Sequence, residues 1–415
     1  MKASTLTEYA AFIGIDWADR KHDVWLQVAG CDTREVSVLP HRPERRAQWA
    51  QALRQRFAGR PIAVCLELSK GPLVSALQPY DCLVRFPVNP TTLAKYRDAF
   101  GLSHAKDDPT DAELALELLM AHRDRLTALH PQSLAMRTLP RLVEQRRTLV
   151  ADKVRLTNRL TDALKPYFPQ VLEWFKDKDT VAFCDFLTRW PTLKQAQQAR
   201  KTRLTAFFQE HNVRYPHIVA ERLQAILQAT PLTFDAGVIV PNRLLVEVLV
   251  QQLRVVLQAI GRFDLAIAPL APTLPDYALF STLPGAGAVY APRLLAAFGE
   301  QRKRYQRAAD VQKFAGRAPV TERSGHKCWV HWRLHCPKFL RQTFVEWAAQ
   351  SIPHSYWARV FYEQQRAKGS SHQAALRALA FKWMRILYRC WQDRTPYHEA
   401  TSLTTLKHRA SPLLR

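Results

Sequence analysis

Four acidic side chains have the types and positions needed to bind a divalent metal ion. Asp16 and Glu67 each end a short apolar run, at residues 11–17 and 61–68. A carboxylate at the end of a buried strand costs desolvation free energy unless a counter-charge meets it. One histidine or arginine could supply that charge. Two carboxylates that converge on Mg²⁺ or Mn²⁺ would do so better, since hard cations prefer oxygen ligands and stabilise phosphoryl transfer.

The other two acids lie in the segment Asp108-Pro109-Thr110-Asp111. An aspartate cap, a proline in the first helical position and an acid in the third are typical of an ordinary helix start. The two interpretations are compatible, because both carboxylates would turn toward one helix end, where the helix dipole favours their ionised forms. Asp107 competes for the same role, but its spacing to Asp111 puts it outside the helix start. The ordered set of a strand aspartate, a strand-end glutamate and a helical Asp-x-x-Asp favours a ribonuclease-H-like fold.

A serine far along the chain is a candidate nucleophile. Ser324 lies in a polar segment, with Gly325 leaving room for close approach by a substrate. A serine in a polar loop usually has no catalytic role. A hydroxyl group beside cations and a metal ion, however, loses its proton more easily. Arg341 follows nearby and could be a phosphate ligand or the solvated end of a helix. The cations expected to hold a phosphate beside the serine are Arg323, Lys327 and Arg333.

Two closely spaced glycines precede a helix predicted over residues 291–298. Gly285 and Gly287 lie in Leu-Pro-Gly-Ala-Gly, and glycines before a helix let backbone amides approach a phosphate. This pattern is similar to the helix-hairpin-helix turn, which contacts nucleic-acid backbones. A tight turn between two core helices is the alternative.

Histidines and cysteines cluster around the serine, but their spacing matches no common zinc finger. Both cysteines lie among aromatic and aliphatic residues, which favours a hairpin with one core face and one surface face over a zinc site. The residues concerned are His326, Cys328, His331, His335 and Cys336.

The elements that must position these residues fall into three regions. Strands interleaved with helices over the first 125 residues predict an α/β domain. Apolar stripes at residues 135–160 and 246–267 resemble coiled-coil faces, which could pair with each other or across subunits, or pack as ordinary amphipathic helices. We predict an α/β domain over residues 1–128, a helical coiled-coil or linker region over 129–275, a mostly α domain with the serine over 276–392, and a basic tail over 393–415 that is loosely ordered after Thr395.

Composition points to a nucleic-acid partner. The formal charge of +24 favours a polyanion, because basic side chains that neutralise phosphates release condensed counterions. The longest apolar stretches are interrupted by charges, and the first nine residues are polar, so no membrane segment or signal peptide is expected. Seven scattered cysteines without a Cys-x-x-Cys pair indicate reduced thiols and a cytoplasmic protein.

Taken together, these residues resemble the DEDD transposases of the insertion-sequence one-ten family over nearly the whole chain. The resemblance implies a RuvC-like domain whose Asp16, Glu67, Asp108 and Asp111 bind metal, and a C-terminal domain whose Ser324 forms a phosphoserine bond with DNA. It also implies guidance by a bridge RNA, DNA partners at the element end and the target, and a dimer of dimers whose subunits share active sites. The motifs that carry it are Gly14-Ile15-Asp16, Leu66-Glu67, residues 106–112, residues 283–287, Phe314-Ala315-Gly316 with Pro319, and Arg323-Ser324-Gly325.

The sequence therefore predicts an RNA-guided DNA recombinase that excises and inserts its own element. The basic segment 41–58 and the coiled region are the candidates for binding the RNA backbone. One alternative is a RuvC-like, metal-dependent endonuclease that resolves DNA junctions by hydrolysis, with Ser324 structural. A non-enzymatic alternative is a protein that packages nucleic acid or binds RNA.

Overall fold

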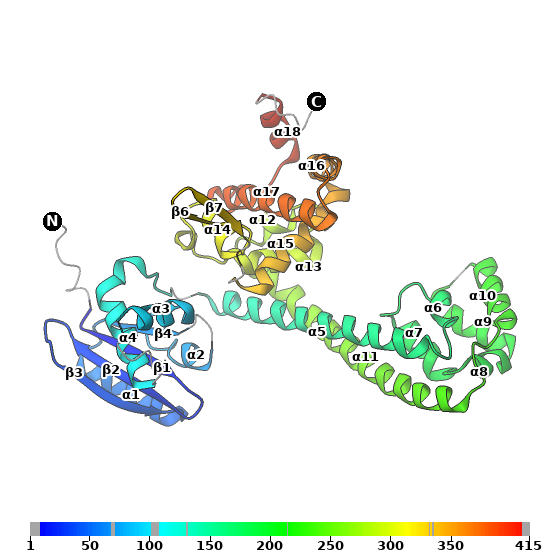
Figure 1. Cartoon of the computed structure of the whole chain (residues 1–415), viewed down its shortest axis with the longest axis horizontal. Coiled ribbons are helices and arrows are strands. Elements are labelled where there is room, and N and C mark those ends of the chain that lie inside the picture. Colours follow the sequence, from blue (N-terminus) through cyan, green and yellow to red (C-terminus); the bar gives the residue numbers. More distant parts are fainter. Residues whose placement is uncertain are drawn as a thin grey trace. The chain divides into compact units, whose positions relative to one another are not determined.

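The computed structural model of the chain describes residues 9–67, 71–100, 108–129, 132–213, 215–331, 333 and 336–408 (Figure 1). Within these ranges the side chains of residues 100, 108, 402 and 405–408 lie outside the description. The chain divides into two compact units, Met1–Pro131 and Gln132–Arg415. The sequence predicts separate domains within the second unit, and this division stays a prediction.

Unit 1 is built on a five-stranded sheet in the order β3-β2-β1-β4-β5. Strands β1, β4 and β5 run parallel to one another, whereas β2 runs antiparallel to β1 and β3 antiparallel to β2. This arrangement is consistent with the ribonuclease-H-like fold that the acids favour. The strands are β1 (Ala11–Trp17), β2 (Lys21–Val28), β3 (Arg34–Pro40), β4 (Ile62–Glu67) and β5 (Leu83–Val88).

Helices cover both faces of this sheet, as the continuous burial along β1 and β4 requires. On one face Ile13, Val64 and Leu66 pack with side chains of α1 (Pro43–Arg56) and α2 (Pro72–Ala76). On the other face Phe12 and Cys65 pack with α3 (Pro90–Phe100) and α4 (Asp108–His122). The sequence predicts β1, β2, β4, β5, α1, α2 and α4 to within a few residues, but not β3 or α3.

The approach of α4 to the sheet depends on Gly14 in β1. A Cβ atom at Gly14 would lie 2.1 Å from the carbonyl oxygen of Ala112 and 2.4 Å from the amide nitrogen of Leu116, both in the α4 backbone. No side chain fits there unless α4 moves. Gly14 thus fixes the first turns of α4 against the strand that ends in Asp16.

We predict that Gly14→Ala destabilises unit 1 by about 3 kcal/mol or more, because the added methyl group overpacks a site closed by backbone atoms. Hydrogen exchange of the full chain, read on peptides covering residues 11–17, should show the loss of protection. Gly261→Ala is the matched control, since a Cβ there meets no atom within 4 Å and alanine favours a helix. Equal protection in the two variants would contradict the prediction.

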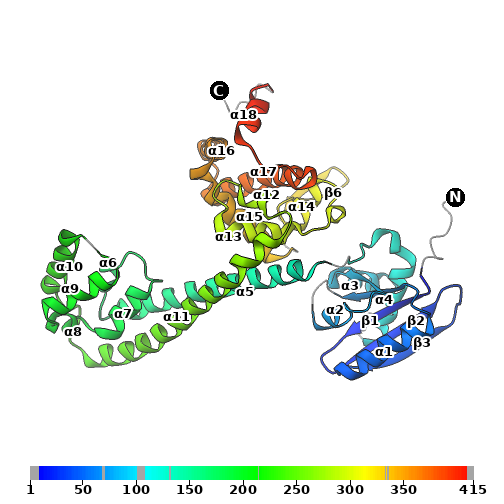
Figure 2. The same ribbon diagram turned by 180° about the vertical axis from the view of Figure 1, so that it is seen from behind.

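Unit 2 contains two long helices that pack side by side, α5 (Leu134–Leu164) and α11 (Ala236–Leu270) (Figures 1 and 2). They coincide with the two predicted stripes and pack against each other within one chain. One end of the pair joins a core with the C-terminal helices, through Met136, Leu139 and Ile267. The other end joins a second core, through Leu160, Val246 and Leu253. A supercoiled geometry for the pair stays a prediction.

The basic, aromatic stretch between the long helices forms this second core. Phe183, Phe186 and Phe207 are fully buried in it, which explains the aromatic residues by packing. Its helices are α6 (Val171–Trp174), α7 (Val181–Arg189), α8 (Leu193–Gln198), α9 (Lys201–Glu210) and α10 (Pro216–Gln228).

The C-terminal part of unit 2 is mostly helical, with one two-stranded hairpin. Trp347, Trp383 and Trp391 are fully buried in its core. Its helices are α12 (Tyr277–Ser281), α13 (Gly287–Phe298), α14 (Ala308–Phe314), α15 (Lys338–Ser351), α16 (Tyr356–Ala367), α17 (His372–Asp393) and α18 (Glu399–His408), and the hairpin strands are β6 (Val320–Ser324) and β7 (Lys327–His331).

The prediction of a loosely ordered tail after Thr395 is wrong for its first part. Tyr397 is buried, and its hydroxyl accepts a hydrogen bond of 2.6 Å from the indole nitrogen of Trp357. The carboxylate of Glu399 accepts hydrogen bonds from the Ser355 hydroxyl at 2.9 Å and from the Trp357 amide at 3.2 Å. These tertiary contacts hold the start of α18 against α16.

One described helix, Ala236–Thr273, is long and apolar enough to cross a membrane by length and composition alone. The core helix of a globular protein passes the same test. Here Val246, Leu249 and Leu253 are fully buried against the aromatic core, and Arg254 pairs with Asp185 of α7. One apolar face of α11 thus packs within unit 2, whereas Val248 and Leu265 of the same helix are 51% and 76% exposed.

Candidate active site residues

Asp16 and Glu67 lie at the carboxyl ends of two adjacent parallel strands. β1 and β4 pair in register up to Ile15 and Leu66, so the next residues along are these two acids, and both are half-buried. In open α/β sheets the carboxyl ends of parallel strands form the usual ligand-binding edge. The structure therefore brings these two predicted residues together on the sheet face that α4 covers.

Asp23, which the sequence reasoning missed, lies directly opposite Asp16 in the antiparallel pair of β1 and β2. Only 4% of its surface is exposed, and Lys21 Nζ lies 3.5 Å from its carboxylate. Like charges directly opposite on neighbouring strands destabilise a sheet. The pairing of the two strands was visible in the sequence, but the register that aligns the two aspartates was not.

Asp111 lies in the first turn of α4 and is 4% exposed. Both of its carboxylate oxygens accept hydrogen bonds from Nη1 of Arg97 in α3, at 2.8 and 2.9 Å. The sequence reasoning missed Arg97 because it missed α3. Asp108 begins α4, as predicted, but its side chain lies outside the description, and Asp107 lies outside the described residues altogether.

Among the described side chains, no group of three or more histidine, cysteine, aspartate or glutamate residues could hold a metal ion. The predicted set includes Asp108, whose side chain lies outside the described residues. The donor chemistry fits a hard divalent cation, because Asp16 and Glu67 offer oxygen ligands from adjacent strand ends.

Ser324 is the last residue of β6 and lies opposite Lys327 across the turn of the hairpin. Gly325 has a φ of +56°, as the first central residue of a type II′ hairpin turn requires. Both strands are exposed apart from Val320. The structure thus places the serine hydroxyl at the solvent-exposed end of a hairpin.

The cations predicted around the serine are distributed on both sides of it. Arg323 precedes it in β6 and Lys327 faces it, and both are exposed. Arg333 is half-buried, and its Nε has no hydrogen-bond partner. No hydrogen bond joins Ser324 to a basic side chain among the described residues.

The two glycines of the 283–287 turn have different surroundings. Both have positive φ, +66° for Gly285 and +49° for Gly287. A Cβ at Gly285 would lie 2.5 Å from the carbonyl oxygen of Gln350, so this glycine is required by packing against α15. A Cβ at Gly287 would meet no atom within 4 Å, which leaves this residue, the first of α13, accessible to a phosphate.

The prediction that one face of the hairpin belongs to the protein core is wrong. Every residue of β7 is exposed, including Trp329 at 48% and Val330 at 66%. His331 Nε2 lies 3.0 Å from Glu322 across the hairpin, and Cys336 packs against Gly316 instead. His335 lies outside the described residues. An exposed aromatic and aliphatic strand is suited to contact with a partner.

Comparison with known proteins decides the family. A family described as "Transposase" under the name DEDD_Tnp_IS110 matches residues 13–169, and a second, "Transposase IS116/IS110/IS902 family", matches residues 277–363. The "Mini-circle putative transposase for IS117" of Streptomyces coelicolor is 28% identical over 96% of this chain and 98% of its own length. The chain belongs to the IS110 family of DEDD transposases.

Two further relatives carry the names of insertion elements. The "Insertion element IS116 uncharacterized 44.8 kDa protein" of Streptomyces clavuligerus is 26% identical over 72% of this chain and 74% of its own length. The "Insertion element IS110 uncharacterized 43.6 kDa protein" of Streptomyces coelicolor is 26% identical over 71% of this chain and 72% of its own length. Membership of a transposase family implies DNA as substrate and DNA recombination as activity.

The two matched regions of this IS110-family transposase contain every predicted site residue. The first includes Asp16, Glu67, Asp108 and Asp111, and the second includes Gly285, Gly287, Ser324 and Arg341. The aromatic core on α6–α10 lies outside both regions. The chemistry predicted from the sequence thus falls in the parts of the chain that define the family.

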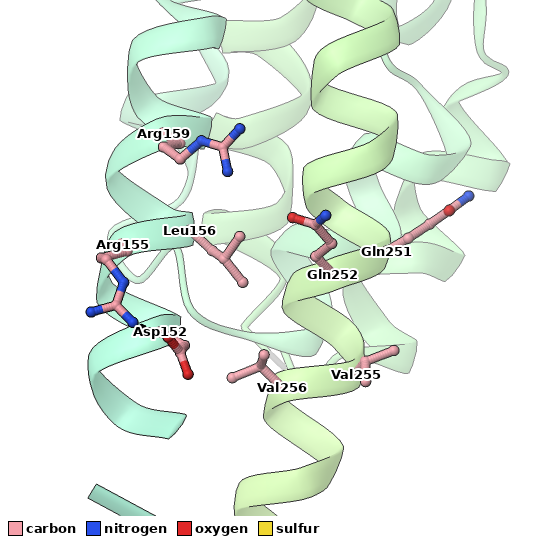
Figure 3. Close-up of a pocket in the computed structure, with 8 residues that line it drawn as sticks. All are labelled: Asp152, Arg155, Leu156, Arg159, Gln251, Gln252, Val255 and Val256. Atoms are coloured by element: carbon pink, nitrogen blue, oxygen red, sulfur yellow. Dashed lines mark hydrogen bonds and ion pairs between the residues drawn. The ribbon is translucent and has the colours of Figure 1, made fainter. Parts of the chain in front are cut away.

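A groove of about 590 Å³ runs between α5 and α11, and its lining includes none of the predicted site residues (Figure 3). Leu156 and Val256 point toward each other across it, and the guanidinium group of Arg159 extends toward the same space. Gln251 and Val255 point away from the neighbouring helix, and Val255 is 65% exposed. The long-helix pair therefore presents unshielded apolar side chains beside arginines.

Proposed function

We propose that this transposase is an RNA-guided DNA recombinase that moves its own insertion element through a covalent phosphoserine intermediate. The observation that carries the proposal is the position of Ser324, exposed at a hairpin end opposite Lys327, in a chain of the DEDD family. A nucleophile that must reach DNA needs an exposed hydroxyl, and cations beside it attract the phosphate.

In this proposal the Ser324 oxygen attacks a DNA phosphorus atom and forms a P–O bond, while the bond from phosphorus to the departing strand breaks. The serine proton leaves the hydroxyl, and the departing oxygen takes up a proton. Arg323, Lys327 and Arg333 hold the phosphate oxygens. The phosphoserine bond keeps the energy of the original diester, so a second strand end can displace the serine and complete the exchange.

The metal site is proposed from Asp16, Glu67, Asp108 and Asp111, with Mg²⁺ or Mn²⁺ as the ion. When bound, the ion would stabilise the negative charge that develops on the phosphate. Arg97 holds Asp111 in position through two hydrogen bonds, as is usual for carboxylates that bind metals. Ser324 and the acids belong to different units, so we propose that they meet in the assembled complex.

Sequence choice is proposed to come from a bridge RNA, since base pairing can specify both the element end and the target. The charge of +24 and the basic helix α1 support contact with a polynucleotide backbone. Cleavage of target DNA should then require the RNA. Cleavage at the same site without RNA would contradict guidance while leaving the serine chemistry intact.

Incubation with end-labelled DNA, the RNA and Mg²⁺, followed by denaturation, tests the covalent step. We expect labelled DNA to migrate with the protein and to be released by protease. The specific alternative is a RuvC-like endonuclease that hydrolyses DNA junctions, and the lack of a bonded base at Ser324 among the described residues favours it. That enzyme would cut the DNA but give no protein-linked product.

Self-association is proposed along the long-helix pair, as part of a dimer of dimers. Val154 and Val255 are 48% and 65% exposed on its two helices, and Val255 adjoins Leu156 and Val256 in one groove. Contiguous exposed apolar patches mark interaction sites.

We predict that Val255→Glu weakens self-association by about tenfold or more, because an unpaired carboxylate is costly to bury in an apolar interface. Light scattering after size-exclusion chromatography measures the change in mass across protein concentrations. Gln258→Glu adds the same charge at an exposed position of the same helix and serves as the control. An unchanged mass distribution for Val255→Glu would place the interface elsewhere.

A further inference from the structure

A basic groove of about 700 Å³ lies on unit 2 between α15, α17 and the segment that follows α14. α15 contributes the side chains of its first three turns, and α17 those of its first two. The charged and titratable residues that line it are Arg317, Lys338, Arg341, Glu346, His372 and Arg377.

The one acid in this groove is already neutralised. Glu346 accepts a hydrogen bond of 3.0 Å from Arg147 of α5 and one of 2.8 Å from the buried Arg293 of α13. Two arginines outside the groove lining therefore compensate the negative charge of Glu346. The remaining charged side chains of the lining are cationic.

These cations lie close enough to repel one another. Burial, followed by the charges of Arg341 and Arg377, lowers the pKa of Arg317 to about 10. The Nε atom of Arg317 is buried and has no hydrogen-bond partner in the part of the chain that the structure describes. An anion would stabilise these neighbouring positive charges and could accept a hydrogen bond from the unsatisfied donor. A phosphate suits this role, because a guanidinium group can donate two parallel hydrogen bonds to its oxygens.

Helix geometry adds to this positive potential. α15 begins at Lys338 and α17 at His372, so the first turns of both helices line the groove. Helix N-termini carry partial positive charge and unpaired amide donors. Two such ends and the arginines therefore favour the same kind of ligand.

We propose that this groove binds a backbone phosphate of the DNA strand that is delivered to Ser324. Two residues separate Arg317 from Val320, where β6 begins, and β6 ends at Ser324, so the groove and the hairpin are joined by a short stretch of chain. The inference rests on the proposed function for the identity of the strand, and adds a strand-holding site that includes Arg317, Lys338 and Arg377 beside Arg341.

The test measures DNA binding in a Ser324→Ala background, where covalent chemistry cannot contribute. Arg317→Gln and Arg341→Gln are compared by fluorescence anisotropy with labelled element-end DNA over a range of salt concentrations. We expect affinity to fall about 5- to 30-fold, and the slope of log affinity against log salt to decrease by about one. Arg385→Gln removes the same charge at an exposed position of α17 outside the groove and should change neither quantity.

Unchanged affinity and salt slope in both groove variants would overturn the proposal. Loss of binding to an RNA of the same sequence but not to DNA would overturn the assignment to DNA. Should a variant fail to fold, phenylglyoxal modification of the Ser324→Ala protein replaces it: DNA should protect Arg317 and Arg341 more than Arg385, and equal protection would contradict the site. Failure of the proposed function would appear separately, as the absence of a protein-linked product from the wild-type chain.

Discussion

Ser324→Ala is expected to abolish the protein-linked DNA product and to reduce strand cleavage by about 10³-fold or more, since removal of a nucleophile leaves only binding and electrostatic stabilisation. DNA affinity should stay within about threefold of wild type, because the alanine retains the hairpin and its cations. Denaturing electrophoresis of labelled DNA measures the product, and anisotropy measures the affinity.

Thr321→Ala provides a matched control for this change. Thr321 lies in the same strand, is exposed, and carries a hydroxyl group three residues from the serine. Its loss should leave the covalent product within about twofold of wild type. Full cleavage by Ser324→Ala would support the hydrolytic endonuclease instead and remove the serine from the chemistry.

The elements that carry the candidate residues could be predicted because local signals determine them. β1 and β4 are short apolar runs that end in acids, and α4 begins with an Asp-Pro pair. α3 also has a local signal that was overlooked. Asn89 precedes Pro90, and its side chain accepts a hydrogen bond of 2.9 Å from the Thr91 amide, as a helix cap does.

β3 could not be predicted in this way, because its burial pattern gives no alternation. Of its seven residues only Leu39 is buried, while Val36 and Val38 are more than half exposed. An edge strand of this kind forms through backbone hydrogen bonds with β2. Such bonds do not require a regular pattern of apolar residues, so the sequence does not indicate the strand.

Several contacts in the candidate sites join residues that are far apart in the chain, and a single sequence does not reveal such contacts. The hydrogen bonds from Arg97 to Asp111 join two helices across one sheet face. The opposition of Asp16 and Asp23 depends on strand register, where a shift of one residue would place them on different faces. The groove around Arg317 combines segments separated by more than 50 residues.

Asp16→Asn should separate a metal-binding role from a structural one. The carboxamide keeps the size of the side chain but loses the charge that attracts a divalent cation, so we expect Mn²⁺ affinity and formation of the protein-linked product each to fall by about 10²-fold or more. Calorimetry with Mn²⁺ and the labelled-DNA assay measure these losses, and circular dichroism melting checks the fold. Asp19→Asn makes the same change at an exposed position two residues past β1 and should retain both properties. Retention of Mn²⁺ binding and of product by Asp16→Asn would remove Asp16 from the proposed metal site and leave its carboxylate a structural role.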